Sequence, residues 1–137
     1  MGTTHDNPAG NVRATLAGVE ELLTVAEDAA RAAGALLLER FADRGALEVT
    51  SKSTSTDLVS DADHAAEACI RAILRERVPE DGIVGEEGDD VASRSGRNWI
   101  VDPLDGTVNF LFGIPQWCVS IACEGEAGSS SSKAASA

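Results

Sequence analysis

Apolar side chains recur every three or four positions along the first part of the chain, and charged residues fill the positions between them. This spacing places the apolar residues on one face of a helix. It predicts a helix over residues 16–43 that ends near Gly45, because glycine suits the residue that follows a helix. Residues 1–15 precede the pattern and are expected to form a flexible tail. The apolar stripe consists of Val19, Leu22, Leu23, Ala26, Ala30, Ala33, Leu37 and Phe41.

A second stretch of helical spacing follows a polar segment. It predicts a helix over residues 61–77, with Ser60 as the residue that caps its first turn. Ahead of it, residues 47–52 are expected to form a short strand and residues 53–56 a polar loop. The apolar face of this second helix would consist of Ala66, Ile70, Ile73 and Leu74.

Three short apolar runs predict buried strands, at residues 83–85, 98–101 and 117–123. Asp102 lies where the second of these strands ends, and residues 103–110 are expected to form a turn that opens a short helical stretch. Helices combined with a few strands predict an α/β chain built in layers.

The composition changes after Glu124. The last segment, EGEAGSSSSKAASA, contains no branched or aromatic apolar residue. Such composition is typical of a low-complexity tail, which we expect over residues 125–137. Residues 16–124 are then expected to form one domain.

The charge of the chain narrows its partners. Eleven basic and 23 acidic residues give a net charge of −12, which argues against nucleic acid or an anionic membrane as the main partner. No apolar run is long enough for a membrane span, and residues 1–15 lack the apolar core of a secretory signal. An acidic protein that handles phosphate needs metal cations or backbone N–H groups at the site.

The chain has three cysteines, an odd number without the spacing of a disulfide framework. This usage predicts reduced thiols and a cytoplasmic location. Cys118 and Cys123 are an odd number of residues apart in a predicted strand, so their side chains would point to opposite faces and would not form a disulfide. We expect Cys118 and Cys123 to pack in the core and not to bind a metal.

Two carboxylates flank a proline immediately after the second predicted strand. Asp102 and Asp105 would project from a stiff turn, with the carbonyl oxygen of Leu104 between them. Oxygen ligands of this kind suit Mg²⁺. The alternative is an ordinary Asp-Pro turn with solvated acids, and the short motif alone does not separate the two.

Gly106 and Thr107 follow directly. A glycine allows close approach to the backbone, and free N–H groups at the start of a helix attract phosphate. Metal ligands next to a phosphate-binding turn suit the hydrolysis of a phosphate ester.

The longer string WIVDPLDGTVNF, residues 99–110, resembles the first signature of the inositol monophosphatase family. Residues 85–87, Gly-Glu-Glu, resemble another element of that family. The stretch DLVSDAD, residues 57–63, resembles a third, which ends in a catalytic aspartate. Residues 113–115 and 119–122 also fit. The resemblance covers residues 16–124 and is a hypothesis that the structural context must support.

The resemblance implies roles for individual residues. Asp63 and Thr107 would activate the attacking water, although an acid at a helix start is also explained by the helix dipole alone. The implied catalytic residues are Asp63, Thr107 and Glu86. Those implied to bind the substrate are Asp105, Gly106 and Thr107. The implied Mg²⁺ ligands are Glu86, Asp102, the carbonyl of Leu104, and Asp105.

The resemblance further implies a sugar-phosphatase-like layered sandwich of the α/β (α+β) class, of which this chain is the N-terminal part, and commonly a homodimer. The implied enzyme is a phosphoric monoester hydrolase that uses Mg²⁺ to convert inositol monophosphate to inositol and phosphate. Histidinol phosphate, fructose 1,6-bisphosphate and 3′-phosphoadenosine phosphates are the alternative substrates.

Members of the family are longer and carry a second, Trp-Asp signature that this sequence lacks. Truncation is therefore expected, and it would leave one face of the sheet uncovered, with exposed apolar side chains. A protein of a different class remains the alternative. It is a catalytically inert fragment that binds a metal ion weakly or pairs with another chain.

Overall fold

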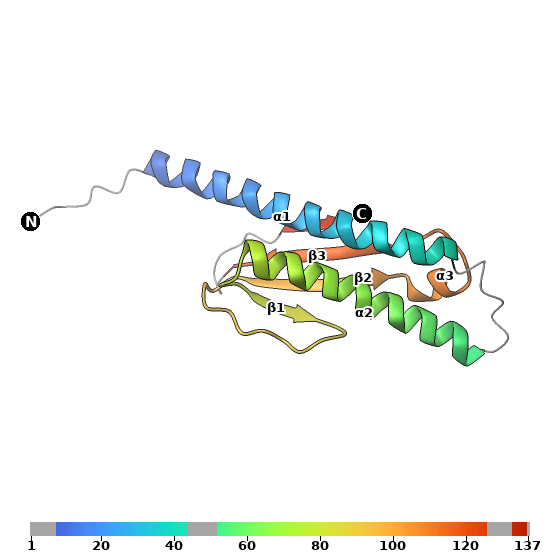
Figure 1. Ribbon diagram of the computed structural model, residues 1–137. Helices are drawn as coiled ribbons and strands as arrows, with labels where there is room; N and C mark the ends of the chain where they lie inside the picture. Colours follow the sequence, from blue (N-terminus) through green and yellow to red (C-terminus); the bar gives the residue numbers. More distant parts are fainter. Residues whose placement is uncertain (1–7, 44–51, 126–132, 137) are drawn as a thin grey trace, which may run out of the picture.

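Two long helices lie side by side on one face of a sheet, as Figure 1 shows. The computed structural model describes the backbone of residues 8–43, 52–125 and 133–136, and the side chains of residues 18–43 and 56–125. The arrangement confirms the expected α/β class. Along the chain the elements are α1 (Pro8–Asp43), α2 (Lys52–Arg77), β1 (Gly82–Gly85), β2 (Asn98–Asp105), α3 (Thr107–Leu111), β3 (Cys118–Glu124) and β4 (Lys133–Ser136).

The sheet has the strand order β1-β2-β3-β4. Strands β1 and β2 are parallel, and the other neighbouring pairs are antiparallel. Because parallel strands run in the same direction, the residues that follow β1 emerge at the same edge of the sheet as the end of β2. Glu86 and Asp102 therefore come to one edge although a loop separates them in sequence.

The core lies between the helices and the sheet. Small residues of α1, such as Ala29 and Ala33, are fully buried and let the helix approach its neighbours closely. The sheet contributes Trp99, Val101 and Ile121, each at most 1% exposed. Residues in β2 and β3 alternate between buried and more exposed positions, the period expected when one face of a sheet is covered.

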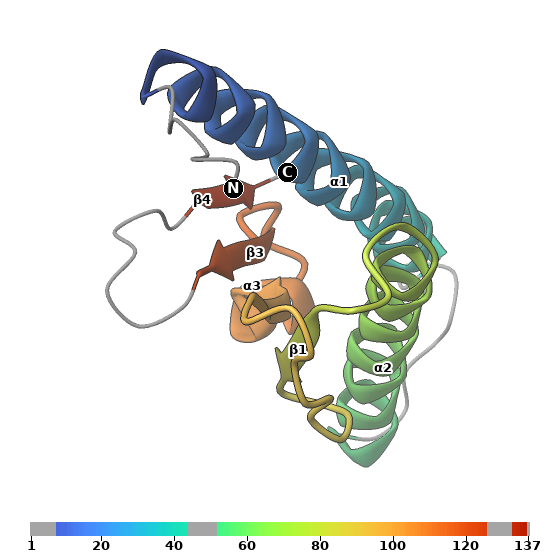
Figure 2. The same cartoon turned by 90° about the vertical axis from the view of Figure 1, so that its left-hand side faces the viewer.

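The opposite face of the sheet is not covered by α1 or α2, which both lie on one side in Figure 2. Val84 and Ile100 pair in register across β1 and β2. Their side chains are 40% and 43% exposed. The expected exposed apolar surface is thus present on the described part of the sheet.

Both long helices begin earlier than the sequence pattern predicts. Helix α1 starts at Pro8, so residues 8–15, expected in a flexible tail, are helical. Helix α2 starts at Lys52, so residues 53–56 belong to the helix and form no loop. The rest of the predicted strand, residues 47–51, lies outside the described residues. Once a helix has formed, each added residue gains a backbone hydrogen bond, so a polar stretch can extend it.

Strand β2 also continues further than predicted. It runs through Asp102 and Pro103 to Asp105, with a shift in register against β3 between Asp102 and Asp105. Proline has no N–H group and is tolerated at such an irregularity, where the ladder of hydrogen bonds is interrupted. The turn expected to begin at Pro103 is therefore a bulged strand end, and the short helix begins only at Thr107.

Two smaller expectations are corrected in the last part of the chain. Strand β3 begins at Cys118, one residue later than predicted. Within residues 125–137, expected to be a tail, Lys133–Ser136 forms β4 and pairs with β3. An open edge strand offers unpaired backbone N–H and C=O groups, with which a segment lacking strong strand residues can also pair.

The cysteines are free, as their spacing predicted. Cys123 is buried in the core, whereas Cys69 and Cys118 are partly exposed. Neither α1 nor α2 contains, in its described residues, a stretch apolar and long enough to cross a membrane.

Candidate active site

Acidic side chains from three elements gather where β1 and β2 end. Asp63 comes from α2, which packs against β2. Glu86 follows β1, and Asp102 lies in the last part of β2. The negative charges of Glu86 and Asp102 both act on Asp63, and the charge of Asp102 acts on Glu86. The structure thus brings Asp63, Glu86 and Asp102, which the sequence predicted to share a site, close enough for their charges to interact.

Asp63 is the most perturbed of these acids. Burial, followed by the charges of Glu87, Asp102 and Glu86, raises the pKa of its carboxyl to about 6. Its side chain is nearly inaccessible, since the residue is 8% exposed. Strong perturbation by burial and by neighbouring acids is typical of functional sites, although ion-pair networks can produce it too.

Glu86 and Asp102 show the same direction of change. Burial, followed by the charge of Asp102, raises the pKa of Glu86. Burial and the charge of Asp105 raise the pKa of Asp102, while a hydrogen bond from the backbone of Leu104 lowers it. Carboxylates that repel one another in this way are stabilised by a bound cation.

One oxygen at this place has no partner. Oδ1 of Asp102 is buried and accepts no hydrogen bond within the described structure. A buried oxygen of a carboxylate normally has a donor or an ion beside it. This unpaired atom and the oxygen-rich surroundings fit a hard divalent cation such as Mg²⁺. Within residues 18–43 and 56–125, however, no three acidic, histidine or cysteine side chains converge as a ready coordination shell.

The turn between β2 and α3 requires glycine. Gly106 has φ 94°, in the left-handed region, and a Cβ atom there would lie 2.9 Å from the carbonyl oxygen of Gln116. The hydroxyl of Thr107 donates a hydrogen bond to the carbonyl of Leu104, at 3.1 Å. No side chain caps the start of α3, so the N–H groups of its first turn have no side-chain acceptor at the N-cap.

Asp105 is exposed and lies beside Cys118. The thiol of Cys118 donates a weak hydrogen bond to Oδ2 of Asp105, with sulfur and oxygen 3.9 Å apart. Burial and the charge of Asp105 raise the pKa of Cys118, so the thiol stays protonated near neutral pH.

Three aromatic side chains pack together beside the turn that carries Gly106. The rings of Phe41, Phe110 and Trp117 lie 5.3 to 5.7 Å apart, in edge-to-face and tilted arrangements. Such pairs stabilise a structure beyond the area they bury. Phe110 belongs to α3 and Trp117 precedes β3, so the cluster fixes both sides of the turn that carries Gly106.

His64 is exposed and contacts both Ser60 and Glu87. Its Nδ1 lies 2.7 Å from the carbonyl oxygen of Ser60, and its Nε2 lies 3.5 Å from Oε2 of Glu87. The Ser60 contact, and then the charge of Glu87, raise the pKa of His64. When it is protonated, His64 places a positive charge next to Glu87.

Sequence reasoning missed three charged side chains: Glu67 and Arg71, which support this region, and Asp81, which lies at the other end of β2. All three are buried. Glu67 and Arg71 lie one turn apart on the face of α2 that also carries Ala66 and Ile70. The signal was a glutamate and an arginine at i,i+4 on an apolar face. Asp81 gave no comparable signal, because it lies in a turn sequence that favours aspartate anyway.

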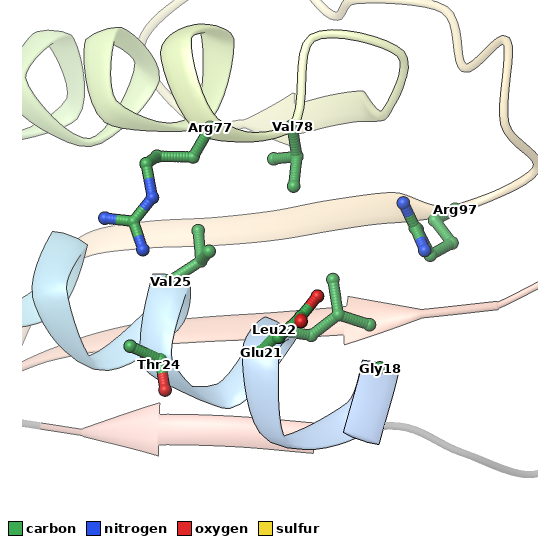
Figure 3. Close-up of a pocket in the computed structure, with 8 residues that line it drawn as sticks. All are labelled: Gly18, Glu21, Leu22, Thr24, Val25, Arg77, Val78 and Arg97. Carbon is green, nitrogen blue, oxygen red and sulfur yellow. The ribbon is translucent and has the colours of Figure 1, made fainter. Parts of the chain in front are cut away.

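A separate pocket of about 410 Å³ lies at the other end of the sheet, between α1, the end of α2 and the start of β2 (Figure 3). Its arginines already have acidic partners. Arg77 pairs with Asp28 and Arg97 with Asp81, each at 3.1 Å. The pocket is therefore distinct from the acidic edge where the motif residues meet.

Asp63→Asn is expected to stabilise the metal-free protein at neutral pH but not at pH 4. Folding raises the pKa of Asp63. The stabilisation of the folded state that follows from this shift is complete below about pH 4, where the carboxyl is protonated, and is lost as the pH rises through 6. Asparagine carries no charge, so the gain reaches at most about 3 kcal/mol above pH 6. Urea unfolding in EDTA at pH 4 and pH 7.5 measures it.

Asp61→Asn is the matched control, because Asp61 is an exposed position of the same helix. Its effect should not change between the two pH values. Equal stabilisation by Asp63→Asn at both pH values would contradict the assignment of a buried, repelled carboxylate.

Comparisons with known proteins agree with the sequence signature. Residues 18–126 match the model of the inositol monophosphatase family. A histidinol-phosphatase from Chlorobaculum parvum is 44% identical over 104 residues, which are 76% of this chain and 39% of that protein. An inositol-1-monophosphatase from Rhizobium meliloti is also 44% identical over 104 residues, 75% of this chain and 39% of that protein.

The fold is similar to that of solved structures as well. The extragenic suppressor protein suhB from Bartonella henselae aligns with a TM-score of 0.65 at 36% identity, covering 77% of this chain and 39% of that one. The chain thus has the fold of the N-terminal part of such proteins, a sugar-phosphatase-like layered sandwich. It spans 39% of the length of each of these three relatives.

Proposed function

Because this chain belongs to the inositol monophosphatase family, we propose that it supplies the metal- and phosphate-binding edge of a Mg²⁺-dependent phosphatase. The reaction is the hydrolysis of a small phosphate monoester, with inositol monophosphate as the first candidate substrate. The observation that carries the proposal is the group of mutually repelling acids around the unpaired Oδ1 of Asp102.

The Mg²⁺ ligands in this proposal are Glu86, Asp102, Asp105 and the carbonyl oxygen of Leu104. Bound Mg²⁺ supplies positive charge that offsets the charge of a phosphate ester and makes nearby water more acidic. The like charges support the assignment: after burial, the charges of Asp102 and Asp105 help to raise the pKa of Glu86, and the charge of Asp105 helps to raise that of Asp102 in the metal-free chain. Small rotations of exposed side chains would be needed to complete the ligand set.

Asp63 is the proposed acceptor of the proton from water. In the metal-free chain, burial and the neighbouring acids raise its pKa to about 6, which supports a role as proton acceptor. The hydroxyl of Thr107 donates a hydrogen bond to the carbonyl oxygen of Leu104. The lone pairs of the hydroxyl oxygen can then accept a hydrogen bond from the attacking water and orient that water. The N–H groups of Gly106 and Thr107 would hold the phosphate, since the start of α3 has no side-chain cap.

The choice of substrate stays open between two phosphate esters. The relatives named histidinol-phosphatase and inositol-1-monophosphatase are equally similar, at 44% identity. Fructose 1,6-bisphosphate and 3′-phosphoadenosine phosphates are further candidates. We also propose residues 16–124 as the domain, a cytoplasmic location and a homodimer.

Phosphate release by the purified chain tests the proposal. Inositol 1-phosphate and histidinol phosphate are offered separately, with Mg²⁺ varied from zero in EDTA to millimolar concentrations. We expect release that rises with Mg²⁺, saturates and is absent in EDTA. Release that continues unchanged in EDTA would contradict the role given to the acids.

A second function, metal binding without turnover, is favoured by the uncovered apolar face at Val84 and Ile100. It predicts Mg²⁺ binding in calorimetry that depends on Asp102 and Asp105, with no release of phosphate from any of the esters. The same pair of measurements therefore separates the two functions.

A further inference from the structure

A buried ion pair lies beneath the loop that carries Glu86. Nε of Arg71 donates to Oε2 of Glu67 at 3.1 Å, and their side chains are only 8% and 2% exposed. The two residues lie one helical turn apart on α2, on the side that meets the loop after β1. Asp63 lies one turn earlier on the same side, so this face of α2 carries charged residues at i, i+4 and i+8.

The second oxygen of Glu67 binds the loop backbone directly. Oε1 accepts hydrogen bonds from the N–H groups of Glu86, at 2.9 Å, and Glu87, at 3.1 Å. Hydrogen bonds to an ionised acceptor are stronger than those between neutral groups. Two consecutive N–H groups on one oxygen fix the direction of the chain at the residue that bears the proposed metal ligand.

Arg71 holds the loop at a second point. Its Nη1 donates to the carbonyl oxygen of Asp89 at 2.7 Å. Glu67 thus binds the loop backbone at Glu86 and Glu87, and Arg71 binds it at Asp89. The side chain of Glu86 is left exposed and free to act as a ligand.

The glycines of the loop show how closely it lies on the ion pair. A Cβ atom on Gly85 would overlap Oε1 of Glu67 and lie 2.7 Å from Nη2 of Arg71. A Cβ atom on Gly88 would lie 3.0 Å from Oε2 of Glu67. The glycines on either side of the glutamates therefore allow the contact.

Stability alone does not explain this pair. Burying two charges is costly, and apolar residues of similar size often stabilise a protein as well or better. In addition, Nη2 of Arg71 is buried and has no hydrogen-bond partner in the described structure, which adds to the cost. The specific result of the pair is the fixed path of the loop from Gly85 to Asp89.

We propose that Glu67 and Arg71 are positioning residues that set the backbone of Glu86 so that its carboxylate meets Asp102 at a shared Mg²⁺ ion. The inference rests on the proposed function, because it assigns the ligand role to Glu86. Residues that orient ligands from behind typically change metal affinity about 10- to 100-fold when replaced.

The main test replaces Glu67 by glutamine, which keeps the shape of the side chain and removes its charge. In EDTA, amide hydrogen exchange at Glu86 and Glu87 should become about tenfold faster or more, because two charge-assisted bonds are weakened. Calorimetry with MgCl₂ should give a Kd raised about 10- to 100-fold. Both are measured on the whole chain and need no turnover.

Asp81→Asn is the matched control. Asp81 is another buried carboxylate that accepts hydrogen bonds from several side chains, but these belong to Ser95, Arg97 and Trp99, at the other end of β2. It should lower stability without changing the Kd for Mg²⁺. An equal change in Kd for both variants would show a general loss of structure and overturn the positioning role.

Gly88→Ala tests the same contact from the loop side, with α2 intact, and serves if Glu67→Gln does not fold. It should also raise the Kd for Mg²⁺. If the unaltered chain binds Mg²⁺ and neither variant weakens binding, the positioning role is wrong while the proposed function stands. If the unaltered chain binds no Mg²⁺, the proposed function fails. Unchanged amide exchange at Glu86 and Glu87 in Glu67→Gln would overturn the positioning role as well.

Discussion

Asp102→Asn is expected to lower Mg²⁺-dependent phosphate release by on the order of 100-fold or more. Asparagine keeps the size of the side chain but removes the charge next to the buried, unpaired Oδ1. The Kd for Mg²⁺ should rise at the same time, so added Mg²⁺ should restore only part of the rate. Initial rates over a range of Mg²⁺ concentrations and calorimetry on the same samples give both values.

The variant should not be less stable than the unaltered metal-free chain. Burial and the charge of Asp105 raise the pKa of Asp102, so the charged form is unfavourable in the folded state without a cation. Asp90→Asn, in the exposed loop after β1, is the control and should leave rate and Kd within about twofold. A rate for Asp102→Asn equal to that of this control would remove Asp102 from the site.

Asp81→Ala is expected to lower the free energy of unfolding by about 3 to 5 kcal/mol. The carboxylate is 1% exposed and accepts hydrogen bonds from Ser95, at 2.6 Å, from Arg97, at 3.1 to 3.2 Å, and from the indole N–H of Trp99, at 2.8 Å. Alanine leaves the indole N–H of the fully buried Trp99 without a partner. Urea unfolding followed by tryptophan fluorescence measures the loss.

Glu80→Ala is the neighbouring control. Glu80 pairs with Arg94 at 3.3 Å, but the side chains are 60% and 72% exposed. Exposed pairs of this kind contribute little, so the change should stay below about 1 kcal/mol. A similar loss for both variants would mean that the loop of residues 86–97 is not held by the Asp81 network.

The folding elements were largely readable from sequence, with errors at their ends. The apolar stripe from Val19 to Phe41 predicted α1 and its end at Asp43, but the start at Pro8 lies beyond the stripe, where the pattern gives no signal. Pro103 suggested a turn after Asp102, because proline usually interrupts a strand. Strand β2 instead continues past it through a bulge opposite β3, a contact between segments distant in sequence.

Some residues of the candidate site could be predicted from the sequence, and others could not. Asp102, Asp105, Gly106 and Thr107 lie within six consecutive residues, so a local motif can identify them and the turn they form. Glu67 and Arg71 carry no such motif. Their importance depends on burial against a loop that begins about 15 residues later, and burial is a property of packing.

The sequence by itself determined the types of element, the glycine turn and the acidic motif, because periodicity and short-range chemistry are encoded in neighbouring residues. Only the tertiary structure decided that β1 and β2 run parallel, so that Glu86 reaches the edge where Asp102 lies. It also decided which charged residues are enclosed. Glu67, Arg71 and Asp81 are buried because distant segments close over them and supply the hydrogen bonds that compensate for the loss of water.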